Sequence, residues 1–502
     1  ENWFDLNASR YTPSSTLQRM ELLKTGYMGT LSLGWDNYLF LELTGRQERS
    51  STLKDQSFFY PSANLSFLFT QAFHMPSWWN YGKLRLSYGI VGNAPETYTA
   101  NIVYEQGSDN GFTWNTIPSS WGNADIHPEK KYEYEIGLES KFLNNRLGID
   151  ISYYYNRVKD QILSTPQPST SGVKNVLMNV GEVANRGWDI SISATPILTR
   201  DFRWDLTANY GVYKNKVVKL ADGVPYLEIL NSGGSGIKIQ AVEGQPMGDI
   251  YAQVPQVNEN GEYLVSDKGL YLNQTELQKV GNINPAGVGG LFNSFSYKNV
   301  FLDFSIDFRI GGDVINEMNQ YATAVGLTPE SLKYRDTEHG GLSYYYPGDN
   351  NSSGIPVQVD PSTGAGPNGE IIYHDGIILP GVVASTGERN TRIIPAGYYY
   401  NTTYNWGTEA EQLTYRHSVF DNSYVKLREL TIGYQFPEKM ISKLGLGRLS
   451  VSVFGRNLFY FYKALKNYDA ESSVGTSWAN QATVGSSTTA TRSFGVSLRA
   501  SF

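Results

Sequence analysis

Strict alternation of apolar and polar side chains over long stretches is the feature that most constrains this chain. From Leu147, one face carries Leu147, Ile149, Ile151, Tyr153 and Tyr155, and the other carries Gly148, Asp150, Ser152, Tyr154 and Asn156. The same split recurs at 132–139, 188–194, 202–212 and 302–310. A period of two predicts strands with one apolar and one polar face. Each predicted strand is about 9–12 residues long, close to the ~9–11 residues that cross a membrane at a tilt.

The connections between the predicted strands alternate between short and long. Short links lie at 36–37, 143–146, 198–201 and 297–300, with slightly longer ones at 71–82 and 437–447. Long polar segments rich in Gly and Pro run approximately over 94–131, 157–183, 214–290, 312–423 and 459–490. Loops above ~12–15 residues are uncommon in compact soluble domains, whereas short periplasmic turns and long extracellular loops are typical of outer-membrane barrels. The sequence therefore predicts an all-β fold, a transmembrane antiparallel β-barrel.

About 14 strands are predicted from the alternation. They begin near Trp3, Tyr27, Tyr38, Phe59, Lys83, Tyr132, Leu147, Arg186, Phe202, Gly290, Phe301, Tyr424, Arg448 and Thr491. The last strand ends in the aromatic Phe502, as the C-terminal strand of a bacterial outer-membrane barrel does. Because the link before this strand is long, we expect Phe502 on the periplasmic side.

The composition agrees with a barrel once the two faces are separated. The chain holds 36 Tyr and 10 Trp, side chains suited to a boundary between lipid and water. It has no stretch near the ~18–20 apolar residues of a transmembrane helix. The absence of Cys excludes disulfide scaffolds, Cys-based zinc sites, iron–sulfur clusters and thiol nucleophiles. A net charge of −7 argues against a nucleic-acid partner.

A search for catalytic constellations predicts that the chain is not an enzyme. The five His residues lack zinc-ligand spacing, and no phosphate-binding loop or nucleophile elbow is present. Glu133 and Glu135 share a strand face as a glycosidase pair would, but a row of polar side chains facing water explains them more simply. No cofactor is expected. The one alternative is a calcium ion bound by the loop 349–354, which lacks the spacing and final Glu of an EF-hand.

Seven short motifs occur in order along most of the chain. They are GYMG (26–29), GRQERSS (45–51), SYGIVGN (87–93), NVGEVANRG (179–187), VFDNSYVKLREL (419–430), FGRNL (454–458) and YDAE (468–471). In these motifs the chain resembles the SusC/RagA family of TonB-dependent transporters of the Bacteroidetes outer membrane. The segment 419–430 is the most specific of the matches.

The resemblance implies that residues 1–502 are the C-terminal portion of a larger barrel. Barrels of this family generally have 22 strands, preceded by an N-terminal extension and a plug domain, and the sequence matches none of those parts. A sheet of 14 strands alone would leave two unpaired edges in lipid, which is not tolerated. We therefore expect that further polypeptide completes the barrel.

The resemblance also implies active import of oligosaccharides or oligopeptides across the outer membrane of a Gram-negative bacterium. Energy would come from the TonB–ExbB–ExbD complex acting through the plug. A SusD-like surface lipoprotein would cap the extracellular mouth, docked chiefly on 94–131 and 312–423. The alternatives are a passive porin, a surface β-rich binding or enzyme module, and a soluble extracellular β-protein. Glycan and peptide substrates both remain open.

Aromatic residues in the long loops are the candidates for contact with a ligand or partner. They are Tyr98, Tyr104, Trp114 and Trp121 in one loop, and Tyr344, Tyr345, Tyr346, Tyr398, Tyr399, Tyr400 and Trp406 in another. Flat rings stack on sugars, hold peptide side chains and are enriched at protein interfaces. Three alternatives remain for these residues: packing within their own loops, contact with the lipoprotein, and contact with substrate.

Overall fold

The structure is a computed structural model. It describes residues 19–54, 57–109, 112–166, 170, 172–221, 223–232, 236–348, 354–405, 414–472, 475, 477–485 and 490–501. The chain divides into two compact units, and each is considered by itself. The first comprises Glu1–Ser66, Leu86–Tyr134 and Asn156–Glu182, and the second comprises Phe67–Arg85, Glu135–Tyr155 and Val183–Phe502.

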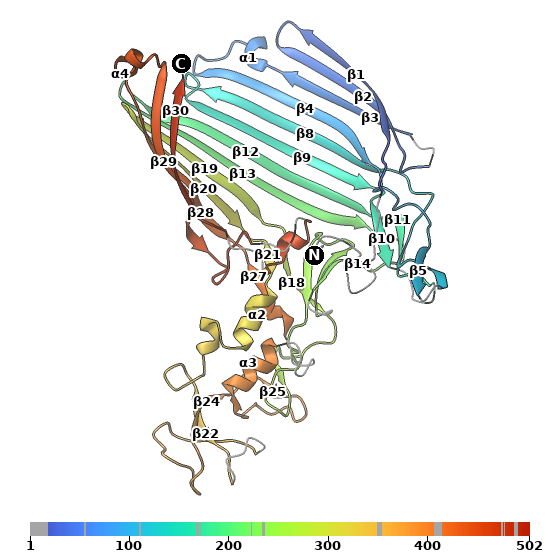
Figure 1. Cartoon of the computed structure of the whole chain (residues 1–502), viewed down its shortest axis with the longest axis vertical. Helices are drawn as coiled ribbons and strands as arrows, with labels where there is room; N and C mark the ends of the chain where they lie inside the picture. The colour runs from blue at the N-terminus through green and yellow to red at the C-terminus, as the bar shows by residue number, and fades with distance from the viewer. Residues whose placement is uncertain are drawn as a thin grey trace, which may run out of the picture. The chain divides into compact units, whose positions relative to one another are not determined.

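The largest sheet has 13 strands, and their order in the sheet follows the chain (Figure 1). They are β1 (Lys24–Trp35), β2 (Leu39–Ser50), β3 (Ser57–Phe67), β4 (Trp79–Asn93), β8 (Glu129–Phe142), β9 (Leu147–Lys159), β12 (Glu182–Leu198), β13 (Phe202–Lys219), β19 (Gly287–Tyr297), β20 (Val300–Ile310), β28 (Tyr424–Gln435), β29 (Arg448–Lys463) and β30 (Ser493–Ser501). Strands that are neighbours in this sheet pair antiparallel, as β19 does with β20. Thirteen predicted strands are thus confirmed, and the one near Trp3 lies outside the described residues.

Three of the four short links, 36–37, 143–146 and 297–300, are tight turns with left-handed backbone. Asp36 and Asn37, between β1 and β2, have φ of 47° and 57°. Asn144 and Asn145 have φ of 57° and 61°, and Lys298 between β19 and β20 has φ of 51°. Asn and Asp adopt this conformation at low cost because their side chains hydrogen-bond locally, and they suit two-residue hairpins. The sequence therefore placed these turns correctly.

The two faces of the sheet follow the predicted alternation. On the apolar face, Trp204 lies opposite Phe295 with the rings stacked 5.5 Å apart, and Phe295 lies opposite Leu302. On the polar face, Ser294 lies opposite Asp303 and donates a hydrogen bond of 2.6 Å to its carboxylate. Cross-strand pairs of like polarity stabilise the register, since a slip by one residue would exchange the faces.

Six strands, β4, β8, β9, β12, β13 and β29, are longer than the predicted 9–12 residues, and the last three exceed it most. β12, β13 and β29 contain 17, 18 and 16 residues. β13 pairs with β19 only from Phe202 to Gly211, so its last residues extend past that neighbour. There the Val217 amide donates to the Gln245 carbonyl, and the Gly244 amide donates to the Val217 carbonyl. The apolar pattern ends before the strand does, which is why the sequence underestimated its length.

Smaller sheets and short helices occupy the segments between the long strands. The strands are β5 (Glu105–Asp109), β6 (Phe112–Thr116), β7 (Ser120–Trp121), β10 (Ile162–Pro166), β11 (Asn175–Asn179), β14 (Tyr226–Ser232), β15 (Ile237–Val242), β16 (Asp249–Ala252), β17 (Leu264–Val265), β18 (Gln278–Asn282), β21 (Asp313–Ile315), β22 (Leu342–Tyr345), β23 (Val357–Gln358), β24 (Tyr373–Ile377), β25 (Val382–Val383), β26 (Ile394–Pro395) and β27 (Val419–Asp421). The α-helices are α1 (Phe69–Ala72), α2 (Glu317–Ala324), α3 (Ala396–Tyr404) and α4 (Glu438–Ile441), and the 3-10 helices are η4 (Pro329–Leu332), η5 (Tyr415–Ser418), η6 (Ser442–Leu444) and η7 (Asn480–Ala482). No helix in the described part of the chain is long and apolar enough to cross a membrane.

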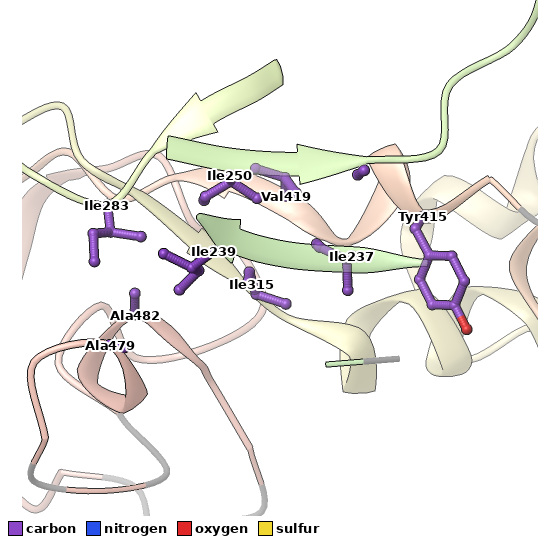
Figure 2. Close-up of a cluster of buried hydrophobic side chains, with 10 residues drawn as sticks. Ile237, Ile239, Ile250, Ile283, Ile315, Tyr415, Val419, Ala479 and Ala482 are labelled. Atoms are coloured by element: carbon purple, nitrogen blue, oxygen red, sulfur yellow. The ribbon is translucent and has the colours of Figure 1, made fainter. Parts of the chain in front are cut away.

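The largest buried cluster of the second unit joins three of the long segments. Ile237 and Ile239 of β15 pack with Ile250 of β16, Ile315 of β21 and Ala482 of η7 (Figure 2). Ile283, Tyr415, Val419 and Ala479 complete the part labelled there. Burying a side chain such as Ile contributes roughly 1.5–3 kcal/mol. Parts of 214–290, 312–423 and 459–490 therefore share one core.

The first unit has a small core of its own. Leu53, Phe58 and Ile126 are buried, and Tyr60 packs edge-on against Phe58 with the ring centres 4.8 Å apart. Ile162 at the start of β10 packs against the same cluster. The sheet β10-β11-β7 extends this region.

Candidate functional site

A β-bulge on β28 interrupts the regular alternation of the large sheet. Glu429 lies opposite Ser305 of β20, but Leu427 lies opposite the next residue, Ile306, so Arg428 is left over. The register with β29 shifts at the same place. A bulge re-aims a side chain that regular pairing would place elsewhere. Arg428 is the side chain that this bulge re-aims.

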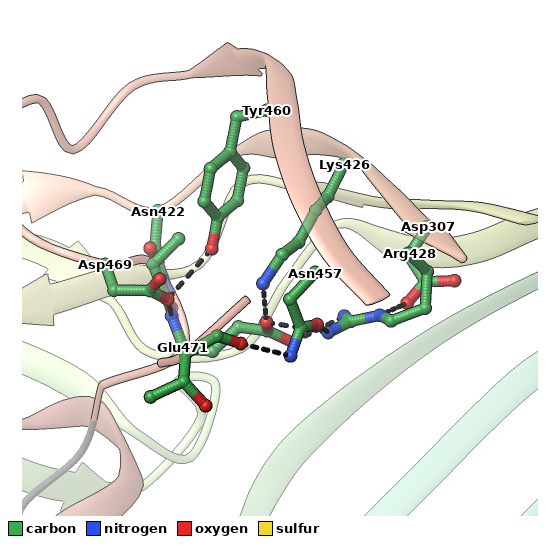
Figure 3. A network of polar contacts seen from close by, with 10 residues as sticks. Asp307, Asn422, Lys426, Arg428, Asn457, Tyr460, Asp469 and Glu471 are labelled. Carbon is green, nitrogen blue, oxygen red and sulfur yellow. Dashed lines mark hydrogen bonds and ion pairs between the residues drawn. The ribbon is translucent and has the colours of Figure 1, made fainter. Parts of the chain in front are cut away.

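The guanidinium of Arg428 contacts three partners. Its Nε donates to Asp307 of β20 over 2.5 Å, and its Nη1 donates to the Asn457 Oδ1 of β29 over 2.9 Å. Nη1 and Nη2 donate to the two carboxylate oxygens of Glu471, over 2.9 and 2.6 Å. Figure 3 shows Arg428 together with these three partners. A two-point guanidinium–carboxylate contact is a strong, directional ion pair.

Lys426 provides a second, more deeply buried cation. Only 1% of its surface is exposed, and its Nζ donates to Glu471 over 2.5 Å. The ammonium also lies 4.8 Å from the centre of the Tyr460 ring, within the range of a cation–π contact. The Tyr460 hydroxyl donates to Asp469 over 2.8 Å. A buried lysine needs such partners to remain charged.

These contacts hold the segment 468–471 against the ends of β28 and β29. The side-chain amide of Asn422 donates to the Ala470 carbonyl over 2.9 Å, and the Lys463 Nζ donates to the Tyr468 carbonyl over 2.6 Å. We call the set the Arg428 network. It consists of Asp307, Asn422, Lys426, Arg428, Asn457, Tyr460, Asp469 and Glu471.

The same place is where the segment 312–423 leaves and rejoins the sheet. Its base is the ladder of β21 with β27, in which Ile315 lies opposite Val419 and Asp313 lies opposite Asp421. The backbone amide of Asn422 donates to the Gly312 carbonyl, and the backbone amide of Gly311 donates to the Ser423 hydroxyl. The Arg428 network therefore anchors both this segment and the one that follows β29.

The electrostatics favour an ionised Glu471. Burial alone would raise the pKa of this carboxyl, but the hydrogen bonds from Arg428 and Lys426 outweigh burial and lower it to about 2. The folded pKa therefore lies below the ordinary value of ~4.3 for Glu. The ion pairs stabilise the network above the ordinary value, and this contribution is lost as the pH falls toward the folded pKa.

We predict that the segment 468–471 stays attached at neutral pH and opens in acid. The loss should fall between roughly pH 4.5 and the folded pKa of about 2, because protonating Glu471 removes its attraction for both cations. Hydrogen exchange of the 464–472 backbone as a function of pH measures this, after correction for the intrinsic pH dependence of exchange. An opening free energy that does not change over that range would contradict the assignment.

The polar face of the sheet carries two open cavities. One, of about 570 Å³, is lined by Ser294, Asp303, Glu429, Thr431, Gln435 and Arg448 among others. The other, of about 560 Å³, is lined by Arg85, Asp150, Asp189, Asn209 and Asp307 among others. Ion pairs lie along this face, such as Arg85 with Asp150 at 2.6 Å. Because Asp307 lines a cavity and also accepts from Arg428, the network borders this face.

The predicted aromatic residues fall into different environments. Tyr344, Tyr345 and Tyr346 are buried, and Tyr344 packs against Tyr373 and donates to Asp375 over 3.1 Å. They pack within their own segment, one of the alternatives considered from the sequence. Burial also raises the pKa of Tyr344, which keeps its hydroxyl a donor.

The α3 tyrosines are divided in the same way. Tyr400 is buried and donates to the Glu330 carbonyl over 2.7 Å, and burial raises its pKa to about 12. Tyr399 is half-buried against Tyr400, with the ring centres 5.1 Å apart. Tyr398 is exposed. Trp406 lies outside the described residues.

The predicted aromatics of the first unit are more accessible. Tyr98, Tyr104 and Trp114 are exposed, and Trp121 is half-buried with its ring 5.9 Å from that of Tyr104. Tyr98 has φ of 67°, and its hydroxyl accepts a bond of 3.1 Å from the Glu21 amide. Contact of these residues with a ligand or partner stays a prediction.

The sequence patterns did not predict the Arg428 network as a site. Six of its eight residues lie in the motifs at 419–430, 454–458 and 468–471, and Asp307 and Tyr460 lie outside them. A signal was present, because apolar residues stand at 425 and 427 and then at 430 and 432, so the alternation slips at Arg428. No group of three or more metal-binding side chains suited to an ion is found among the described residues. Most of the calcium alternative, residues 349–353, lies outside them, so that hypothesis is untested.

Comparison with known proteins places this fold. Residues 4–242 match the family described as TonB dependent receptor-like, beta-barrel. TonB-dependent receptor P3 of Formosa agariphila is 24% identical over 494 residues, which cover 89% of this chain and 42% of that protein. TonB-dependent receptor SusC of Bacteroides thetaiotaomicron is 30% identical over 247 residues, 45% of this chain and 24% of SusC.

A solved structure of the RagAB peptide transporter has the same fold. It superposes with a TM-score of 0.67 at 19% identity, over 94% of this chain and 48% of that chain. The chain thus spans less than half the length of these relatives. Their names are those of receptors and transporters, which confirms the prediction of a protein that is not an enzyme. The chain is therefore similar to TonB-dependent receptors over most of its length, its residues 4–242 match the β-barrel of that family, and its fold is that of an outer-membrane β-barrel.

Proposed function

We propose that the chain forms part of the barrel of an active importer for large hydrophilic nutrients. The observation that carries the proposal is the Arg428 network, which anchors two long segments beside a cavity-bearing polar face. The polar side of a receptor barrel lines the path of the solute. Anchored loops at its end are suited to present a solute or a partner to that path.

The proposed substrates are oligosaccharides or oligopeptides. Both signs of charge line the cavities, with Arg85 beside Asp150 and Arg448 near Asp303 and Glu429. Such a surface offers donors and acceptors to hydroxyl and peptide groups alike. RagAB, whose fold is similar, is described as a peptide transporter. That description supports an oligopeptide substrate without excluding a glycan.

The proposed partners are the TonB–ExbB–ExbD complex and a SusD-like surface lipoprotein. The lipoprotein would dock on the segments 94–131 and 312–423. Tyr98, Tyr104, Trp114 and Tyr398 are exposed there and remain candidates for this contact. Exposed aromatic side chains on anchored loops are frequent anchors of protein interfaces.

Uptake measured in living cells tests the proposal. Cells carrying the full-length gene should accumulate a labelled oligopeptide or oligosaccharide, and deleting either this gene or tonB should reduce uptake to background. Uptake that survives tonB deletion but needs this gene would indicate the passive porin. Surface binding without internalisation would indicate the surface binding protein.

A further inference from the structure

Three basic side chains line one cavity near the ends of β12 and β13. Arg186, Lys214 and Lys216 border a space of about 450 Å³, which Tyr155, Ala184, Asn185, Asn215, Gly244 and Pro246 complete. The three basic residues are exposed. Within the part of the chain that the structure describes, none of these three side chains forms an ion pair. The cavity is therefore strongly basic, and no acidic side chain lines it.

The cavity opens on the apolar face of the sheet. The rings of Tyr153 on β9 and Trp188 on β12 are in contact on that face, 4.9 Å apart. Arg186 lies two residues before Trp188, and Tyr155 lies two residues after Tyr153, so both share that face. On β13, Lys214 and Lys216 continue the row of Tyr210 and Val212 by the same alternation. These side chains thus extend the surface that faces lipid.

The position along β13 places the cavity at one membrane boundary. The strand begins at Phe202, directly after the short link 198–201. The stretch 202–212 supplies the ~9–11 residues that cross the hydrocarbon layer at a tilt. Lys214 and Lys216 then reach the level of the headgroups, where Tyr and Trp are also enriched in membrane barrels. With the short links on the periplasmic side, this level belongs to the outer leaflet.

The wall of the cavity is fixed by hydrogen bonds. The Met247 amide donates to the Asn215 Oδ1 over 2.9 Å, and the turn at Gly244 is bonded to Val217 in both directions. Glu243, the carboxylate next to this turn, accepts a bond of 3.4 Å from the Leu220 amide. The turn therefore stays beside Lys214 and Lys216.

We propose that this basic cavity binds a phosphate group of the lipopolysaccharide headgroup in the outer leaflet. A guanidinium and two ammonium groups that lack acidic partners suit a phosphate monoester, which Arg contacts through two N–H groups and Lys as a point charge. Basic pockets at the membrane boundary bind anionic headgroups in this way. A soluble phosphate has the same chemistry, but the cavity faces lipid. The site is independent of the transported substrate.

The test uses the full-length protein purified from outer membranes in mild detergent. The variant Arg186→Ala/Lys214→Ala/Lys216→Ala is compared with Arg200→Ala/Lys298→Ala/Lys439→Ala, which removes the same charge from the short-link end. Native mass spectrometry measures the binding of added phosphorylated lipid A and of the same lipid without phosphate. We expect at least ten-fold weaker binding of the phosphorylated lipid by the first variant only, and weak binding of the phosphate-free lipid by all proteins.

Two further measurements, one on a charge-retaining variant and one with inorganic phosphate as competitor, can contradict the proposal. The charge-retaining variant Arg186→Lys/Lys214→Arg/Lys216→Arg should bind close to the unaltered protein, and the heat-dependent gel mobility of a folded barrel verifies each variant. If the alanine variant fails to fold, the single variant Lys214→Glu replaces it. Equal binding of phosphorylated lipid by the unaltered protein and the cavity variant would overturn the proposal. Displacement of the lipid by an equal concentration of inorganic phosphate would also overturn it, in favour of a soluble anion.

Discussion

Replacing Glu471 by Ala is expected to release the segment 468–471 from the ends of β28 and β29. The substitution leaves Lys426, which is almost fully buried, without its carboxylate, and it removes a two-point contact of Arg428. Breaking a buried ion pair by removing one partner costs about 3–5 kcal/mol. Part of Glu471 is exposed, so the lower end of that range is expected. Hydrogen exchange of residues 464–472 at neutral pH measures the opening free energy.

A double variant separates the ion pair from the general packing of this region. Lys426→Met/Glu471→Ala removes both charges, so no buried ammonium is left unpaired, and the opening free energy should recover by more than half. Glu388→Ala is the matched control because it removes an exposed carboxylate that forms no ion pair with a described residue. If Glu471→Ala and Glu388→Ala behaved alike, the Arg428 network would not anchor the segment.

The large sheet could be predicted because its two faces meet different solvents. Lipid on one side and water on the other impose a period of two, so Trp204, Leu206 and Ala208 stand on one face and Asp205 and Thr207 on the other. The turns could be predicted because Asp36 and Asn37 tolerate left-handed backbone. Both signals are local in the sequence. They gave the strands to within a few residues at most ends.

The interior of the long segments could not be predicted in the same way. Tyr344, Tyr345 and Tyr346 have no periodic pattern around them, and whether each is buried depends on β24 and β26, which lie much further along the chain. The Arg428 network has the same property, because Glu471 reaches Arg428 across 43 positions of sequence. The break in alternation at Arg428 indicates a bulge, but it does not predict which residues the Arg428 side chain contacts.

The largest functional effect is expected from replacing residues 317–414 with a short Gly-Ser linker. The segment carries α2, α3 and the sheet β23-β22-β24-β26, while its base, the ladder of β21 with β27, lies outside the replacement. Ile315, Tyr415 and Val419 also remain, so the shared core with Ile237 and Ile239 keeps these members. We therefore expect the barrel to assemble in the outer membrane and the co-purified lipoprotein to fall at least ten-fold.

The control replaces the turn 437–446 at the other end of β28 and β29 with a short hairpin turn. It alters β28, the long strand that follows the replaced segment 317–414, at its short-link end, where α4 and η6 lie, and should leave the lipoprotein bound. Quantitative mass spectrometry of the purified complexes reports the ratio of lipoprotein to barrel, and heat-dependent gel mobility reports folding. Unchanged co-purification with a folded barrel would remove 317–414 from the docking surface and leave 94–131 as the segment to test. Loss in both variants would instead indicate that the lipoprotein needs an undisturbed barrel, because of the long strands only β28 adjoins both replacements.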